Sequence, residues 1–236
     1  GQVCSLEDKC LEGTPLRILA EFEESDRWVL EPGDMLYLPP CLAHYGISQG
    51  NCQTYSIGFR APTKTELMHS LIDQIAANCD DDSRYQDPDL KLQEHCGEIS
   101  ESALQQVRDF MTQALADPVL LGDTIGKLMT EAKYPELQDD KSDAKYNVSD
   151  LKFDLQSTDI QRELHSRFAF NSHQDNHSFY AGGKAHPITE DSLELAKYLT
   201  QQRQYNGRQL QTLCENRDNE KLLLSLWQDG HFFSGE

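Results

Sequence analysis

The stretch LEPGDMLYLPPCLAH, residues 30–44, decides the fold. A turn signal at Pro32-Gly33 precedes an apolar run, and the double proline Pro39-Pro40 ends that run. Proline fixes the backbone angle φ, so the two prolines set the direction in which the chain enters the next loop. His44 comes four residues after Pro40. We therefore expect its imidazole at a strand edge with little freedom, as a metal ligand requires; the alternative is a histidine that is simply hydrogen-bonded in a loop.

The residues around this stretch read as β structure. Residues 27–30 and 35–38 flank the turn, and residues 53–59 alternate polar and apolar side chains. A period of two is typical of a half-buried strand. The same alternation places Thr54, Ser56 and Gly58 on one face of the last strand, where they are either ligand contacts or plain strand hydroxyls.

Residues 64–146 carry helical periodicity instead. Three apolar stripes recur at helical spacing, and each follows a residue type that caps helices. The caps are Thr63 or Thr65, then Ser100, then Asp117 before Pro118, a proline in its favoured first-turn position. Pro135 is expected to stop the third helix, and residues 136–145 read as a linker.

Residues 147–236 show a mixed pattern. We expect strands within 161–170 and 178–181, a turn at Gly182-Gly183 that leads into a further short strand, and a closing strand at 230–233. Helices are expected after Thr189 and over 207–214 and 219–227. Helices with a β-ribbon in under 100 residues suggest a winged-helix-like module. Such modules often bind DNA, but the segment carries 13 acidic and 9 basic residues, which favours contact with protein.

Charge excludes some functions. The 236 residues hold 40 acidic and 21 basic side chains, a net charge of −19. This balance argues against nonspecific duplex binding, which needs Lys and Arg, and favours a basic partner. More than half of the charge, −10, falls on residues 64–146.

No apolar run is long enough to span a membrane. The seven cysteines contain no CxxC pair, so reduced cytoplasmic thiols are expected.

The stretch 30–44 resembles the second motif of the cupin superfamily, Gly-x5-Pro-x-Gly-x2-His. Gly33, Pro39 and His44 match, while Cys41 stands at the motif's second glycine. Together with YSIGFRAP at 55–62, the stretch is similar to the JmjC-type oxygenases. It is most similar to the bacterial ribosomal oxygenases that hydroxylate an arginine of a large-subunit ribosomal protein.

The resemblance implies an α+β fold in three parts: a partial double-stranded β-helix (cupin/JmjC jelly roll) over 1–63, a helical dimerisation region with linker over 64–146, and a winged-helix-like domain over 147–236. It implies an Fe(II)- and 2-oxoglutarate-dependent hydroxylase, cytoplasmic and homodimeric. The implied substrate is a basic ribosomal protein, namely ribosomal protein sixteen of the large subunit. His44 matches the distal histidine of the iron triad, and Thr54 and Ser56 are the candidates to contact 2-oxoglutarate.

The other two iron ligands of the family come from an upstream His-x-Asp motif, and this sequence has no histidine before His44. We expect the chain to be a C-terminal portion of the enzyme, inactive alone; an intact non-catalytic relative is the alternative. Two other functions stay open. One is an acidic dimerisation and protein-binding module, and the other is a metal-dependent cupin isomerase or dioxygenase without 2-oxoglutarate. A zinc site of Cys41, Cys52 and His44 is a further alternative.

Overall fold

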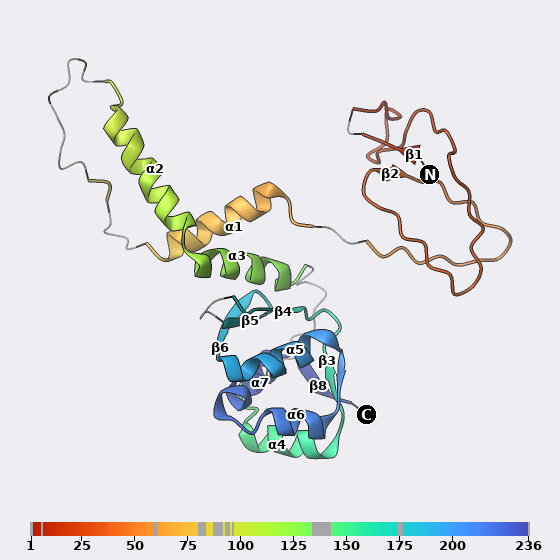
Figure 1. Cartoon of the computed structure of the whole chain (residues 1–236). Helices are drawn as coiled ribbons and strands as arrows, with labels where there is room; N and C mark the ends of the chain where they lie inside the picture. Colours follow the sequence, from red (N-terminus) through yellow and green to blue (C-terminus); the bar gives the residue numbers. More distant parts are fainter. Residues whose placement is uncertain are drawn as a thin grey trace. The chain divides into compact units, whose positions relative to one another are not determined.

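The chain folds into two compact units. The computed structural model describes residues 2–5, 7–58, 61–79, 84–86, 92, 95, 97–133, 143–173 and 177–235. Unit 1 comprises Gly1–Phe59 and unit 2 comprises Arg60–Glu236 (Figure 1). Among the described residues no helix is long and apolar enough to cross a bilayer.

Unit 1 contains little regular structure. Its two strands, β1 (Gln2–Val3) and β2 (Leu42–Ala43), pair antiparallel, with Gln2 opposite Ala43 and Val3 opposite Leu42. One isolated antiparallel bridge joins Cys10 to Leu19. None of the described residues of unit 1 is buried, so this part of the chain has no hydrophobic core of its own.

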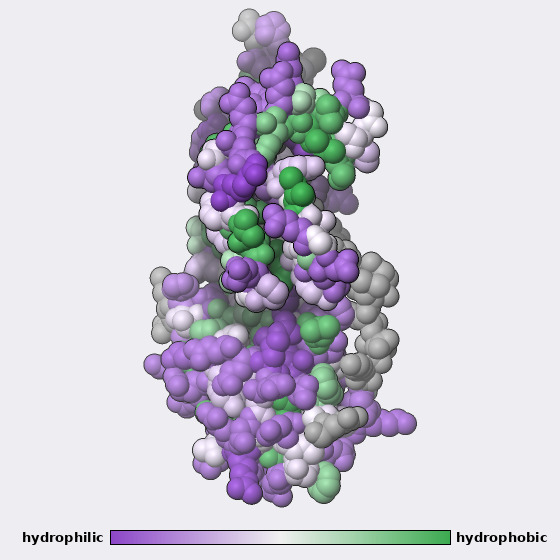
Figure 2. All heavy atoms as spheres, turned by 90° about the vertical axis from the view of Figure 1, so that its right-hand side faces the viewer, coloured by the Kyte–Doolittle hydropathy of each residue, from purple (hydrophilic) through white to green (hydrophobic). Residues whose placement is uncertain are grey.

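The prediction of strands at 27–30, 35–38 and 53–59 was wrong, because none of their described residues lies in a strand. A strand forms when its backbone groups find a neighbouring ladder, and the described chain offers these segments none. Their apolar side chains are open to solvent: Met35 is 93% exposed and Ile57 79% exposed. Figure 2 shows apolar groups, in green, at the surface among polar ones. Phe59, the end of the last expected strand, lies outside the described residues, as does Arg60 in the stretch 55–62.

The three helices expected in the middle of the chain are confirmed, with their caps. They are α1 (Lys64–Ala77), α2 (Glu101–Leu115) and α3 (Pro118–Thr130). Thr63 caps α1 in a capping box with Glu66, Ser100 caps α2 and Asp117 caps α3. α1 packs on α3, and the expected stop at Pro135 and the linker residues 136–142 lie outside the described residues.

An antiparallel three-stranded sheet covers another side of α3. Its strands are β4 (Phe168–Asn171), β5 (His177–Ala181) and β6 (Lys184–Ile188), in the order β4-β5-β6. The turn between β5 and β6 is the expected Gly182-Gly183, whose φ angles of 56° and 77° favour glycine. Helix and sheet approach closely at Gly126, where an added Cβ would lie 2.4 Å from the ring of Tyr180.

The main core lies in the C-terminal part of unit 2. A second antiparallel sheet, β7-β3-β8, packs there with four helices. The elements are α4 (Val148–Ser157), β3 (Ile160–Arg162), a 3-10 turn (Glu190–Ser192), α5 (Leu193–Gln201), β7 (Gln204–Tyr205), α6 (Gly207–Leu213), α7 (Arg217–Gln228) and β8 (Phe232–Ser234). Three helices and the closing strand were expected, whereas α4 and β7 were missed. α4 begins at a capping box of Asn147 and Asp150 and buries Leu151 and Leu155.

Candidate functional site

The turn that precedes the candidate ligand forms as expected. The backbone N–H of Asp34 donates to the carbonyl of Glu31 at 3.0 Å, and the Glu31 N–H donates to the Asp34 carboxylate at 2.9 Å. Gly33 has a φ of 98°, which a side chain would strain. This segment therefore reverses the chain ahead of the run that leads to His44.

Cys41 bends the chain again just before His44. Its φ is 62°, the left-handed region that favours glycine, and glycine is the residue that the cupin motif has at this position. The Cys41 carbonyl accepts a hydrogen bond from the N–H of Cys4 at 2.8 Å, which continues the β1–β2 pairing by one residue. The strand β2 follows, and His44 comes directly after it.

His44 is held only by local contacts among the described residues. Its side chain is exposed, and its Nδ1 lies 3.3 Å from the carbonyl oxygen of Leu42. A nitrogen that donates to a carbonyl fixes the tautomer and leaves Nε2 as the free ligand atom. The position is compatible with a metal ligand at a strand end.

Thr54 and Ser56 are both exposed and lie in no strand. No hydrogen bond between either residue and the His44 imidazole occurs within the described part of the chain. The structure thus leaves their expected contact with 2-oxoglutarate untested, and the role remains a prediction.

The described residues do not complete an iron site. An iron of this chemistry needs two histidines and a carboxylate on one face, whereas no group of three or more His, Cys, Asp or Glu side chains in the described chain is placed to hold a metal. The same observation leaves the zinc alternative of Cys41, Cys52 and His44 without support. Of the three iron ligands that this chemistry needs, the described residues of unit 1 supply one candidate, the His44 imidazole.

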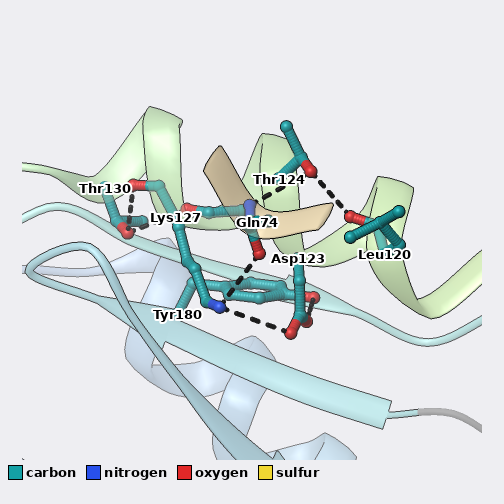
Figure 3. A network of polar contacts seen from close by, with 8 residues as sticks. Gln74, Leu120, Asp123, Thr124, Lys127, Thr130 and Tyr180 are labelled. Carbon is teal, nitrogen blue, oxygen red and sulfur yellow. Dashed lines mark hydrogen bonds and ion pairs between the residues drawn. The ribbon is translucent and has the colours of Figure 1, made fainter. Parts of the chain in front are cut away.

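A polar network that the sequence did not suggest joins α1, α3 and β5 (Figure 3). Gln74 of α1 donates to the Thr124 hydroxyl at 3.1 Å and accepts from the Lys127 ammonium at 3.0 Å. Asp123 accepts from the Tyr180 hydroxyl at 3.0 Å and lies 3.7 Å from Lys127. The spacing of Asp123 and Lys127, four apart on one helix, is the signal that could have indicated it.

Burial and Asp123 raise the pKa of Tyr180 to about 12, so its hydroxyl stays a donor. Beside the network a hollow of about 380 Å³ is lined by Ser70, Asp73, Gln74, Lys127, Leu128, Glu131, Gly182 and Gly183. It is open and has no group of metal-binding side chains among the described residues. The network therefore holds α1 and α3 on the sheet.

A second buried polar pair lies where β8 begins. The Ser166 hydroxyl and Nδ1 of His231 are 2.8 Å apart, and both side chains are buried. Burial lowers the pKa of His231 to about 4, with neighbouring Asp229 opposing the shift. The imidazole is neutral at neutral pH and acts as a structural partner of Ser166.

Known proteins resemble both the sequence and the fold. Residues 1–67 match the family model of the JmjC domain. The chain is 30% identical over 105 residues to the ribosomal protein uL16 3-hydroxylase of Escherichia coli, a match that covers 44% of this chain and 28% of that protein. It is 33% identical to a probable ribosomal oxygenase of Haemophilus influenzae, covering 37% of this chain and 23% of the relative.

Solved structures of the Escherichia coli ribosomal oxygenase YcfD share the fold. One crystal structure superposes with a TM-score of 0.62 at 19% identity, covering 76% of this chain and 48% of that one. A complex of the same oxygenase with cobalt and 2-oxoglutarate gives a TM-score of 0.60 at 18% identity, with the same coverage. This chain spans less than half the length of the relatives that it matches. The resemblance read from residues 30–62 is thus confirmed: the chain carries a JmjC-domain match and is homologous to the ribosomal oxygenases.

Proposed function

We propose that this chain works as part of an Fe(II)- and 2-oxoglutarate-dependent oxygenase that hydroxylates a ribosomal protein. The observation that carries the proposal is the JmjC match over residues 1–67, which includes His44 and its loop. In this assignment His44 supplies one iron ligand, and the remaining ligands lie outside the described residues of this chain. Thr54 and Ser56 are the proposed contacts of 2-oxoglutarate.

We propose the basic ribosomal protein uL16 as the substrate, and an arginine as its modified residue. Two observations support this proposal. The Escherichia coli relative is named for uL16, and this chain carries a net charge of −19. Opposite charges speed the encounter of two proteins, and salt screens them. Binding of purified uL16 to this chain is therefore expected to weaken steeply as salt is added.

We propose that the helices α1 to α3 form a homodimer interface. α2 has no buried residue, and the apolar side chains Leu104, Val107, Phe110, Met111 and Leu115 are each about half exposed. An amphipathic helix gains stability by burying such a stripe, so a second copy of the chain is the proposed cover. The three-part division at 1–63, 64–146 and 147–236, and a winged-helix-like form of the last part, belong to the same proposal.

The enzyme is proposed to be cytoplasmic, because ribosomal proteins are made and assembled there.

The decisive experiment uses a hybrid in which this chain replaces the matching portion of the Escherichia coli uL16 3-hydroxylase. We expect the hybrid to add one oxygen atom to uL16, measured by mass spectrometry, only with Fe(II) and 2-oxoglutarate. His44→Ala should abolish the mass increase, whereas the exposed neighbour change Ser48→Ala should preserve it.

Ser56→Ala in the hybrid should raise the KM for 2-oxoglutarate with a smaller effect on kcat. A folded hybrid without hydroxylation, or a His44→Ala hybrid with full activity, would contradict the assignment. The isolated chain is expected to turn over no 2-oxoglutarate, because its described residues hold no complete metal cluster. Iron-dependent turnover by the isolated chain would refute that expectation.

A non-catalytic acidic module for dimerisation and protein binding is the second candidate. It is favoured by the half-exposed stripe of α2 and by the absence of a metal-holding cluster from the described residues. The two candidates differ in one result. If the chain is a non-catalytic module, we expect the hybrid to bind uL16 with the expected salt dependence but to leave the mass of uL16 unchanged.

A further inference from the structure

Two cysteines lie side by side in the backbone next to the loop that carries His44. The β1–β2 register pairs Gln2 with Ala43 and Val3 with Leu42, and Cys4 and Cys41 are the next residues on the two sides of this pair. The hydrogen bond of 2.8 Å from the N–H of Cys4 to the carbonyl of Cys41 follows this register. The Cys4 thiol also points at that carbonyl, with Sγ 3.3 Å from the oxygen.

The hydrogen bond brings the two backbones as close as a disulfide needs. Residues that are hydrogen-bonded across an antiparallel pair have Cα atoms about 5.5 Å apart, and a disulfide spans about 4.4–6.8 Å. Both thiols are free. Cys41 is exposed and Cys4 is partly exposed, so an oxidant reaches the pair without unfolding.

We propose that Cys4 and Cys41 form a reversible disulfide under peroxide, which makes this pair an oxidative modification site of the protein. The exposed Cys41 thiolate attacks the peroxide O–O bond, giving a sulfenic acid and one water. The Cys4 thiol then attacks that sulfur, forming the S–S bond and releasing a second water. Two thiols are oxidised by two electrons in total and one peroxide is reduced.

The disulfide would tie β1 to the residue at which the chain bends toward His44. Cys41 precedes the two residues of β2, and His44 follows them. Oxidation therefore adds a covalent bond to the backbone pairing that holds the base of the His44 loop. The proposal does not rest on the function proposed above, because it concerns the thiols alone.

The test oxidises the full chain at micromolar concentration with hydrogen peroxide, blocks the remaining thiols by alkylation and maps the disulfides by mass spectrometry without reductant. Cleavage after Tyr45 separates Cys41 from Cys52, and cleavage after Lys9 isolates Cys4. We expect a 4–41 crosslink at least about tenfold more abundant, relative to 4–52, in the folded chain than in the urea-unfolded chain, because folding alone gives Cys4 and Cys41 a high effective concentration.

Dithiothreitol should reverse the crosslink and Cys4→Ser should abolish it. Cys52→Ser is the matched control, since Cys52 is also exposed and free, and it should leave the 4–41 crosslink unchanged. Equal amounts of 4–41 and 4–52, crosslinks mainly between chains, or sulfinic acids without a disulfide would each overturn the proposal. The experiment measures a covalent product, so its result does not depend on whether the protein has hydroxylase activity.

Discussion

Gly126 is a position in unit 2 where one added methyl group should be costly. It lies inside α3, and a Cβ there would sit 2.4 Å and 2.5 Å from the Cδ2 and Cε2 atoms of Tyr180. Ordinary contacts of this kind are 3.4–4 Å. Tyr180 is 1% exposed, and its hydroxyl is held by Asp123, so the ring has little room to move away.

The expected magnitude is the balance of two opposed effects. Replacing Gly by Ala inside a helix stabilises the folded state by about 1 kcal/mol when nothing clashes. Overpacking a core by a methyl group costs about 1–3 kcal/mol. Gly126→Ala should therefore lower the free energy of unfolding by up to about 2 kcal/mol, and lower the Tm by a few degrees.

Gly122→Ala is the matched control, one turn earlier on the same helix. Its added Cβ would meet the terminal amide nitrogen of Asn171 at 2.6 Å, and this amide is the far end of a flexible side chain whose oxygen accepts a hydrogen bond from the His173 N–H at 3.0 Å. We expect a change within about 0.5 kcal/mol, because the propensity gain offsets a small adjustment. Urea unfolding followed by circular dichroism measures both variants.

A second background separates the clash from any other effect. Tyr180→Leu removes the ring that the new methyl group meets, so Gly126→Ala should become neutral or stabilising in that background. The reasoning fails if Gly126→Ala is more stable than the parent chain. It also fails if the penalty is the same with leucine at position 180.

Three further predictions concern other elements. The pKa of His231 is about 4 in the folded chain and about 6.5 in the unfolded chain, so the unfolded chain binds the proton first as the pH falls. This residue should therefore lower the free energy of unfolding by about 2 kcal/mol between pH 7 and pH 5. In urea unfolding, His231→Asn should lose about 2 kcal/mol less than the parent chain over the same pH range. Phe110→Glu should convert the proposed dimer to a monomer in light scattering, whereas Gln105→Glu, at an exposed position on the side of α2 away from the apolar stripe, should not; equal masses for both variants would argue against the interface. Thr63→Ala should cost about 1 kcal/mol of unfolding free energy by removing the capping box, with Thr65→Ala as a near-neutral control, and equal losses would refute the role of the cap.

The helices were predictable because their signals are local. Thr63, Ser100 and Asp117 each sit at the first residue before an apolar stripe, and each accepts the hydrogen bond that its type predicts. The turn at Gly182-Gly183 is local for the same reason. α4 carries an equally local signal, Asn147 followed by Asp150 and then Leu151 and Leu155, so the sequence contains the information needed to predict this helix as well.

The strands expected in unit 1 do not form in its described residues, because their signal in the sequence is not sufficient by itself. Alternation in residues 53–59 states which side chains prefer burial, but it does not provide the neighbouring strand that the backbone needs. The polar contacts that hold unit 2 together are non-local as well. Gln74 meets Thr124 and Lys127 across some 50 residues, and Ser166 meets His231 across 65, and no spacing rule connects them.

The one part of the candidate site that sequence and structure explain together is the base of the His44 loop. The cupin motif has glycine where this chain has Cys41, and Cys41 takes the left-handed φ of 62° that such a glycine would supply. That bend lets Leu42 and Ala43 pair with β1, so the position of His44 depends on Gln2 and Val3, some 40 residues away in sequence. Changes that disrupt β1 should therefore disturb the position of the His44 imidazole as much as changes in the residues next to it.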